Sequence, residues 1–218
     1  MLKIEYPVTH GWEAAIRGMR NPLNSWNKSD TYFNTVSKVP TIGENDLKLM
    51  RKLCRAGGEH RKFMRYINVT FDLTAPLVFW QQMDTYKVGT VRNSCSKMHK
   101  LLYKQFTIDD FACESLDPEA MDVLTALVIQ LNDWRERYLK TPVEDYETRN
   151  HLWDAILRLL PESYCQRATM QMNYEVLRNI YRQRKGHKLP EWTVFIKWVD
   201  TLPYAKELLT DEGGDTTQ

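Results

Sequence analysis

Residues 67–74 have the sequence INVTFDLT, in which apolar and polar side chains alternate without a break. Successive side chains of a β-strand point to opposite faces, so the pattern predicts a strand with one buried face. Ala75 and Pro76 follow and precede the apolar run 77–80. A proline suits the first turn of a helix, and we therefore expect a buried helix after the strand.

Other elements are expected on both sides of this strand. Residues 21–30 are rich in turn formers and predict a loop, most simply a surface loop, in which Trp26 looks buried. Residues 84–100 form a polar, basic block without a clear period. Hydrophobic spacing and turn residues predict an edge strand at 2–4 and a second strand over 164–172. They also predict a helix that begins at 117 and is broken at Pro142, and further helices over 11–19, 45–56, 144–160, 173–184 and 191–209. Mixed strands and helices without repeats predict an α+β protein with a single domain over 1–210 and a mobile polar tail at 211–218.

The composition excludes several classes of protein. Hydrophobic residues make up 43% and charged residues 27% of the 218 residues, as in an ordinary globular protein. The net charge of +2 is too small for a nucleic-acid coat protein or a membrane-surface binder. No run approaches the ~18 apolar residues of a membrane span, and the amino terminus has no apolar signal region. We therefore expect a cytoplasmic protein without membrane contact.

The standard catalytic and metal motifs do not occur in this sequence. The cysteines, at positions 54, 95, 113 and 165, form no CxxC pair, so we expect reduced thiols and neither a zinc site nor a disulfide framework. The five histidines show no HExxH spacing, and no metal site is predicted. GxGxxG, GxxxxGK[ST] and GxSxG are also missing, which removes the common dinucleotide, phosphate-loop and serine-hydrolase readings.

What stands out is the order of a few motifs along the chain. A helix ends in Gly57-Gly58 with Glu59-His60, the strand ends in Ala75-Pro76, the basic block follows, and residues 159–192 read LLPESYCQRATMQMNYEVLRNIYRQRKGHKLPEW. This order resembles the flavin-dependent thymidylate synthases. That family has a Leu-Pro, an arginine, a strand ending in Val-Asn, a helix ending in Leu-Arg, and a Gln-Trp-Glu. The matching positions are Leu160-Pro161, Arg167, Met172-Asn173, Arg184 and Glu191-Trp192.

The resemblance implies roles for several of these residues. By analogy with the family, Asn173 contacts a flavin and Arg184 holds the nucleotide substrate. A guanidinium offers a fork of donors to a phosphate or a uracil carbonyl, which a lysine does less well. Arg167 and Lys97 are assigned to the substrate on the same basis.

The family signature R-H-R-x-x-S-x-N-x-x-S-x-R-Y falls on the basic block with many replacements. Thr85-Tyr86-Lys87 stands for Arg-His-Arg, and Thr90, Arg92, Cys95 and Lys97-Met98 stand for the later members. Lys87, Thr90 and Arg92 are the expected flavin-binding residues of this block. Upstream, Phe63-Met64-Arg65 replaces a Phe-Glu-His whose histidine faces the flavin in the family. Losing one charge-assisted hydrogen bond typically costs ~1.5–3 kcal/mol, so these replacements put the standard activity in question.

The resemblance implies a fold with a central, mainly antiparallel sheet flanked by helices. It implies FAD as cofactor, NADPH and methylenetetrahydrofolate as co-substrates, and transfer of a one-carbon unit to C5 of a deoxyuridylate-type pyrimidine nucleotide. It also implies a homotetramer with sites between subunits. The alternative is a non-catalytic protein that keeps the fold and binds a nucleotide or flavin. A third reading, nucleic-acid binding through the basic block, is disfavoured by the small net charge, since duplex binding needs several phosphate contacts.

Overall fold

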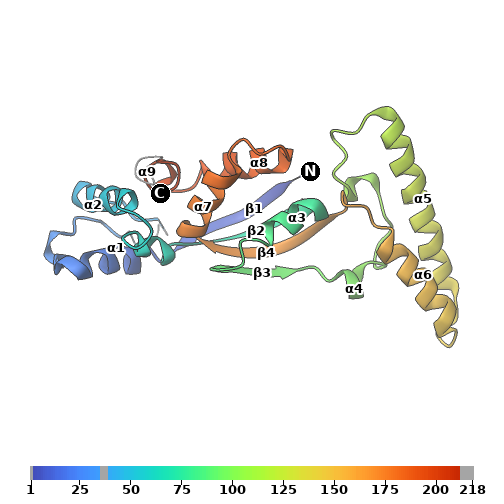
Figure 1. Cartoon of the computed structure of the whole chain (residues 1–218). Helices are drawn as coiled ribbons and strands as arrows, with labels where there is room; N and C mark the ends of the chain where they lie inside the picture. The colour runs from blue at the N-terminus through green and yellow to red at the C-terminus, as the bar shows by residue number, and fades with distance from the viewer. Residues whose placement is uncertain (1, 35–38, 212–218) are drawn as a thin grey trace. The chain divides into compact units, whose positions relative to one another are not determined.

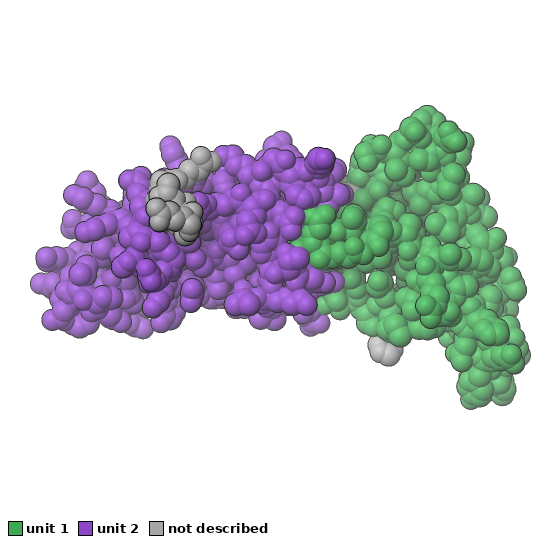
Figure 2. All heavy atoms as spheres, viewed as in Figure 1, with its two compact units in different colours: residues 1–3, 74–83, 94–168 green, residues 4–73, 84–93, 169–218 purple. Residues whose placement is uncertain are grey.

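The computed structural model describes residues 2–34 and 39–211. The chain divides into two compact units, shown in different colours in Figure 2. Unit 1 comprises residues 1–3, 74–83 and 94–168, and unit 2 comprises 4–73, 84–93 and 169–218. The domain boundary expected at residue 210 stays a prediction. Of the tail expected to be mobile, only Asp211 is described, and it is held by an ion pair with Arg55 (2.9 Å); residues 212–218 lie outside the described residues.

A four-stranded sheet with the order β1-β2-β4-β3 is the centre of the α+β fold (Figure 1). Its strands are β1 (Lys3–His10), β2 (Asn68–Pro76), β3 (Thr90–Ser94) and β4 (Cys165–Asn173). The backbone N–H of Tyr174 donates to the carbonyl of Ile67 (2.9 Å), and that of Leu77 donates to the carbonyl of Tyr164 (3.0 Å). The start of β2 therefore faces the end of β4, and its end faces the start of β4, which is antiparallel pairing. The predicted antiparallel sheet is confirmed.

The alternating stretch is the buried strand that the sequence predicts. Ile67, Val69, Phe71 and Leu73 are each at most 1% exposed. The Phe71 ring lies 4.6 Å from the ring of Trp198 on α8 (Pro190–Val199). This face of the sheet is therefore covered by α8, with α7 (Tyr174–Arg184) beside it (Figure 1).

The predictions for the carboxy-terminal half of unit 2 need one correction. The continuous helix expected over 191–209 is wrong, because α8 ends at Val199 and a separate turn of helix, α9, spans Ala205–Leu208. Pro203 cannot continue the hydrogen-bond ladder, and Tyr204 adopts a left-handed conformation with φ 54°. The Tyr204 hydroxyl accepts a hydrogen bond from the N–H of Ile42 and donates one to the carbonyl of Pro40, both at 2.9 Å.

The basic block contains a strand that the sequence analysis missed. Residues 90–94 form β3, an edge strand with no fully buried side chain. An exposed edge strand carries no hydrophobic alternation, so the period of two that revealed β2 is missing here.

Unit 1 contains α3 (Leu77–Met83), α4 (Lys97–Lys100), α5 (Pro118–Lys140) and α6 (Tyr146–Arg158). Helix α5 begins where the sequence predicts, since the Asp117 carboxylate caps it by accepting from the N–H of Ala120 (2.8 Å). A hydrophobic core lies against its predicted apolar face and includes Leu101, Phe106, Phe111, Leu124, Val128, Leu131 and Ile156.

The cysteines, the hydropathy of the helices and the grouping of potential metal ligands can be described for the residues of the structure. All four cysteines are free, and Cys54 alone among them is buried. Across residues 2–34 and 39–211, no helix has both the length and the apolar character needed to cross a membrane. The same residues hold no cluster of three or more potential metal ligands among His, Cys, Asp and Glu.

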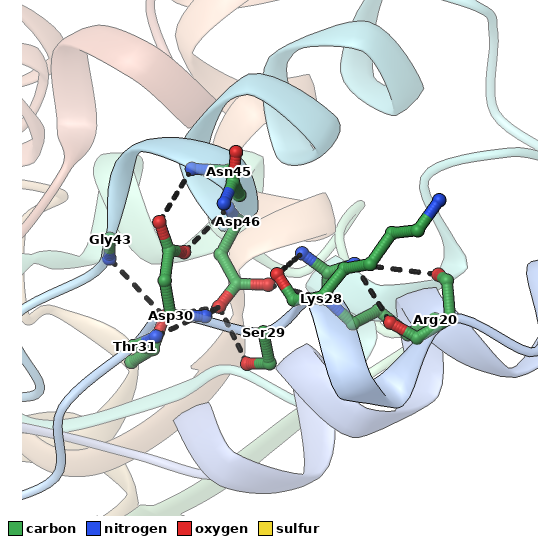
Figure 3. Close-up of polar contacts among 9 residues, drawn as sticks. Arg20, Lys28, Ser29, Asp30, Thr31, Gly43, Asn45 and Asp46 are labelled. Atoms are coloured by element: carbon green, nitrogen blue, oxygen red, sulfur yellow. Dashed lines mark hydrogen bonds and ion pairs between the residues drawn. The ribbon is translucent and has the colours of Figure 1, made fainter.

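A buried ion pair fixes the predicted loop at residues 21–30 to helix α2 (Glu44–Arg55) (Figure 3). The Nε of Arg20 donates to Oδ1 of Asp46 at 2.6 Å, and these residues are 3% and 0% exposed. The other oxygen of Asp46 accepts from the hydroxyls of Ser29 (2.7 Å) and Thr31 (2.6 Å). Burial alone raises the pKa of Asp46, but the hydrogen bonds from Thr31, Ser29 and Arg20 outweigh burial, and the pKa lies below its ordinary value.

The prediction that Trp26 is buried in this loop is wrong. Its side chain is 52% exposed, and its indole N–H donates to Oδ1 of Asn21 at 2.7 Å. The loop is anchored by the polar contacts of Arg20 and Asp46 rather than by an inserted tryptophan.

Candidate ligand-binding site

A hollow of about 910 Å³ opens in unit 2 along α7. It is lined by Gly58, Arg61, Arg65, Val88, Gly89, Asn173, Glu175, Val176, Arg178, Asn179, Arg182 and Gln183. Four arginines face a single glutamate in this lining. Such an excess of positive charge favours an anionic ligand.

Asn173 lies where β4 ends and α7 begins. Its Oδ1 accepts a hydrogen bond from the N–H of Val176 (3.0 Å) and so caps the helix. Because the first N–H groups and the dipole of a helix favour negative charge, this end of α7 adds to the attraction of the arginines. Asn173 is the residue that the resemblance assigned to the flavin, and the structure places it in the hollow.

Gly89 lets the loop before β3 approach the Asn173 side chain closely. Its φ is +77°, a left-handed conformation that glycine adopts without strain. A Cβ atom at this position would lie 2.7 Å from Nδ2 of Asn173 and 3.2 Å from a methyl group of Val176. Any larger residue would therefore push this wall of the hollow away from the helix end.

Arg61 and Glu175 form a partly buried pair in the wall. The Nε of Arg61 lies 3.0 Å from each carboxylate oxygen of Glu175. This pair holds the turn after Gly58 against α7. Arg65 and Arg182, also in the lining, are exposed.

Arg178 is the buried arginine of the lining, with only 1% of its surface exposed. One terminal nitrogen donates to the carbonyl of Leu208 (2.8 Å) and the other to the carbonyl of Asp211 (2.9 Å). Its Nε is buried and has no hydrogen-bond partner among the described residues. Burial lowers the pKa of Arg178, and the neighbouring guanidinium groups of Arg61 and Arg182 lower it further.

A second cluster adjoins the hollow at Gln183 and contains Arg184. The Nε of Arg184 donates to the hydroxyl of Tyr86 (2.9 Å), which donates to Oε1 of Gln183 (2.9 Å). The guanidinium carbon of Arg184 lies 4.9 Å from the ring centre of Trp192. The hydroxyl of Tyr86, the residue that the resemblance aligns with the family's histidine, thus fixes Arg184.

The structure brings together some of the residues predicted for the site. Asn173 lines the hollow, and Arg184 lies in the adjoining cluster. Lys87 is exposed in the loop before Gly89, while the hydroxyl of Thr90 is buried and has no partner among the residues described. Arg92 forms an ion pair with Asp84 at 2.8 Å.

Lys97 and Arg167 belong to unit 1, in α4 and β4 respectively. The lining of the hollow does not include them. Their assignment to the substrate stays a prediction from the resemblance.

The sequence analysis did not select Arg61, Arg178 and Arg182 as binding residues. A signal was available for two of them, because Glu175, Arg178 and Arg182 follow one another at spacings of three and four on the predicted helix. Such residues share one face of a helix. The burial of Arg178 and the pairing of Glu175 with Arg61 depend on tertiary packing.

The architecture that holds this hollow is the fold of the flavin-dependent thymidylate synthases. A crystal structure of the enzyme ThyX from Helicobacter pylori, complexed with FAD and dUMP, superposes with a TM-score of 0.67 and 16% identity. The match covers 97% of this chain and 99% of that chain. A second ThyX structure from the same organism, with FAD and dUMP, gives 0.67 and 17% identity over 97% of this chain and 98% of the other.

The sequence comparisons find no such likeness. No protein-family model matches the chain, and no curated protein sequence matches it. At 16–17% identity, the similarity to the two ThyX structures is a similarity of fold. It confirms, for the fold, the resemblance to the family that the order of motifs indicated.

Proposed function

We propose that this protein is a divergent flavin-dependent thymidylate synthase-like enzyme. It binds FAD and a deoxyuridylate-type nucleotide, and it transfers a one-carbon unit from methylenetetrahydrofolate to C5 of the pyrimidine with NADPH as reductant. The observation that carries the proposal is the hollow lined by four arginines along α7, in a chain with the ThyX fold.

The residues present fit a ligand with phosphate groups. The lining has three more arginines than carboxylates, since four arginines stand against Glu175. Because Gly89 has no side chain, its backbone lies close to the side-chain amide of Asn173. A pyrophosphate can contact such a wall of backbone and amide groups. The buried hydroxyl of Thr90 has no partner in the described part of the chain, so a polar ligand would satisfy it.

The roles of individual residues follow from their contacts. Asn173 uses its oxygen to cap α7, which leaves its Nδ2 as the donor for the flavin. Lys87, Thr90 and Arg92 are the other proposed cofactor-binding residues. Arg184, held by Tyr86, orients the pyrimidine nucleotide, with Lys97 and Arg167 as further proposed substrate ligands. When bound, the flavin supplies the redox chemistry, while these side chains bind and orient the reactants.

A non-catalytic nucleotide- or flavin-binding protein is the second candidate, and Tyr86 favours it. Its hydroxyl is engaged on both sides, by Arg184 and Gln183, and its side chain is only 7% exposed. The residue at the family's histidine position is thus occupied in holding other side chains.

Visible absorption of the purified protein, before and after addition of FAD and desalting, tests cofactor binding directly. We expect a flavin band close to one per chain. Isothermal titration with dUMP and an assay of dUMP-dependent NADPH oxidation with methylenetetrahydrofolate then separate the two candidates. Binding without turnover supports the non-catalytic protein, and a colourless protein that binds neither ligand contradicts both.

Arg182→Met and Arg17→Met are the matched variants for these titrations. Both arginines are exposed on helices, but only Arg182 lines the hollow. We expect Arg182→Met to weaken the binding of the phosphate-bearing ligands about tenfold, and Arg17→Met to leave it unchanged. Equal affinities of the two variants would place the ligand elsewhere.

The expected homotetramer remains part of the proposal. Light scattering on the protein after gel filtration measures it directly, and a mass of one chain, 25.8 kDa, would contradict it.

A further inference from the structure

Arg178 is a buried charge that forms no ion pair with a described carboxylate. In the part of the chain that the structure describes, its hydrogen bonds go only to the carbonyls of Leu208 and Asp211. Buried charges in proteins are normally paired, because moving an ion out of water costs several kcal/mol. Within the described residues, Arg178 therefore lacks an ion-pair partner.

The groups packed around Arg178 do not supply such a partner. Cys54 is nearby, but burial raises the pKa of its thiol to about 12, so it is neutral at physiological pH. The Glu175 carboxylate is bound by Arg61 through both oxygens. The Asp211 carboxylate favours the charged form of Arg178 from a distance, but its ion pair is with Arg55 at 2.9 Å. Arg61 and Arg182 add positive charge instead.

Arg178 hydrogen-bonds the segment 208–211 to α7, since two of the segment's four carbonyls accept from its guanidinium. The segment has other ties as well: Leu208 is the last residue of α9, the amides of Leu209 and Thr210 donate to the carbonyl of Ala205, and Asp211 pairs with Arg55. Arg178 thus contacts the carboxy-terminal segment with its terminal nitrogens while it lines the arginine hollow.

We propose that Arg178 couples the arginine hollow to the segment Leu208–Asp211, so that a phosphate-bearing ligand in the hollow tightens this segment onto α7. The inference rests on the proposed binding of such ligands in the hollow. The bound anion supplies the missing counter-charge and stabilises the guanidinium in its buried position. That position is the one in which both carbonyls are hydrogen-bonded. Because coupling between two sites is reciprocal, the attached segment also keeps the Arg178 guanidinium in the position that binds the anion and so increases the affinity for the anion.

Hydrogen exchange of the amides of Leu208, Leu209 and Thr210 reports on this coupling. In the structure these amides donate to the carbonyls of Tyr204 and Ala205. Exchange is measured on the full chain alone, with dUMP, with FAD and with inorganic pyrophosphate, and calorimetry gives the bound fraction in each case. We expect each ligand that binds to slow exchange of these amides about fivefold or more, the lower end of typical coupling between sites.

Arg178→Met and Arg55→Met form the matched pair of variants. Arg178→Met keeps an unbranched apolar stem similar to that of arginine but removes the guanidinium, with its charge and both hydrogen bonds. Arg55→Met removes the other tie of Asp211 without touching the hollow. We expect ligand-induced protection to disappear in Arg178→Met and to persist in Arg55→Met. If Arg178→Met does not fold by circular dichroism, Arg178→Lys takes its place and is expected to retain only part of the protection.

The outcomes separate this inference from the proposed function. Tight binding of dUMP or FAD without a change in exchange, or with equal protection in Arg178→Met, overturns the coupling and leaves the function standing. Protection by pyrophosphate in a protein that binds neither dUMP nor FAD supports the coupling and contradicts the function. A protein that binds none of the three ligands contradicts both.

Discussion

Arg20 and Arg178 are both almost completely buried, at 3% and 1% exposed, yet their surroundings differ. Arg20 meets the Asp46 carboxylate at 2.6 Å and two backbone carbonyls, so its charge is neutralised and its donors are used. Arg178 meets two carbonyls and, among described residues, no carboxylate. The first arginine belongs to a closed polar network, and the second belongs to the lining of a hollow.

The difference shows that burial of a charged side chain does not by itself mark a binding site. The balance of charge around it is the useful observation. A neutralised pair such as Arg20–Asp46 holds a loop in place, whereas an arginine that lacks a counter-ion beside a hollow attracts one from solution. Four perturbations measure how far this distinction holds.

Asp46→Ala is expected to have the largest effect. It leaves Arg20 buried without its counter-ion and removes the acceptor for Ser29 and Thr31. Removing one partner of a buried pair typically costs about 3–5 kcal/mol, and we expect a loss of this size in the free energy of unfolding, measured with urea. Glu207→Ala, which removes the partly exposed partner of the exposed Arg51, serves as control and should cost less than about 1 kcal/mol. A small effect of Asp46→Ala would remove the contrast between the two arginines.

Acid should remove part of the same stabilisation. The pKa of Asp46 is lowered from 3.8 in the folded protein, so the unfolded chain takes up the proton at a higher pH than the folded chain does. The contribution is therefore fully present well above 3.8 and is lost as the pH falls through the lower, folded-state pKa. Unfolding free energies of the wild type and of Asp46→Asn, measured from pH 7 down to pH 3, should converge at the acid end. Parallel curves would contradict the assignment.

Arg178→Met should disturb stability much less than Asp46→Ala. The loss of two hydrogen bonds to carbonyls is offset by removal of a buried charge that lacks a carboxylate. We expect the free energy of unfolding to fall by about 1–2 kcal/mol. A loss as large as that of Asp46→Ala would mean that Arg178 is a structural residue of the same kind as Arg20.

Tyr86→Phe tests the adjoining cluster and should have the smallest effect. It removes the hydroxyl that accepts from Arg184 and donates to Gln183, so Arg184 is held less firmly. We expect the affinity for dUMP to fall about fivefold, equivalent to ~1 kcal/mol, while that for FAD stays the same. Tyr103→Phe, at an 80% exposed position, is the control. An unchanged dUMP affinity would separate Tyr86 from nucleotide binding.

The predictability of the fold followed the strength of its hydrophobic patterns. Strand β2 was found because its apolar side chains alternate, and α5 because Asp117-Pro118 precedes a long apolar face. Strand β3 was missed because an edge strand with no fully buried side chain leaves no alternation in the sequence. The break between α8 and α9 was missed although Pro203 signalled it, since the apolar spacing continues across the proline.

The candidate site was less accessible to sequence reasoning. Asn173 and Arg184 emerged only through the order of motifs shared with a known family. The spacing of Glu175, Arg178 and Arg182 could have indicated a shared helix face, but the burial of Arg178 could not be predicted, because an arginine on a helix is expected to be exposed. The opposite error was made for Trp26. A large aromatic residue in a polar loop suggests burial, but this side chain lies at the surface.

The contacts of Tyr204 have a consequence for how the chain acquires its structure during synthesis. Its hydroxyl joins the backbone at Pro40 and Ile42 across 164 and 162 residues. The loop before α2 therefore emerges from the ribosome long before its partner exists. At typical elongation rates of ~5–20 residues per second, the wait is on the order of ten seconds or more. We expect nascent chains that end before Tyr204 to be cut by protease near Pro40, and completed chains to resist cleavage there.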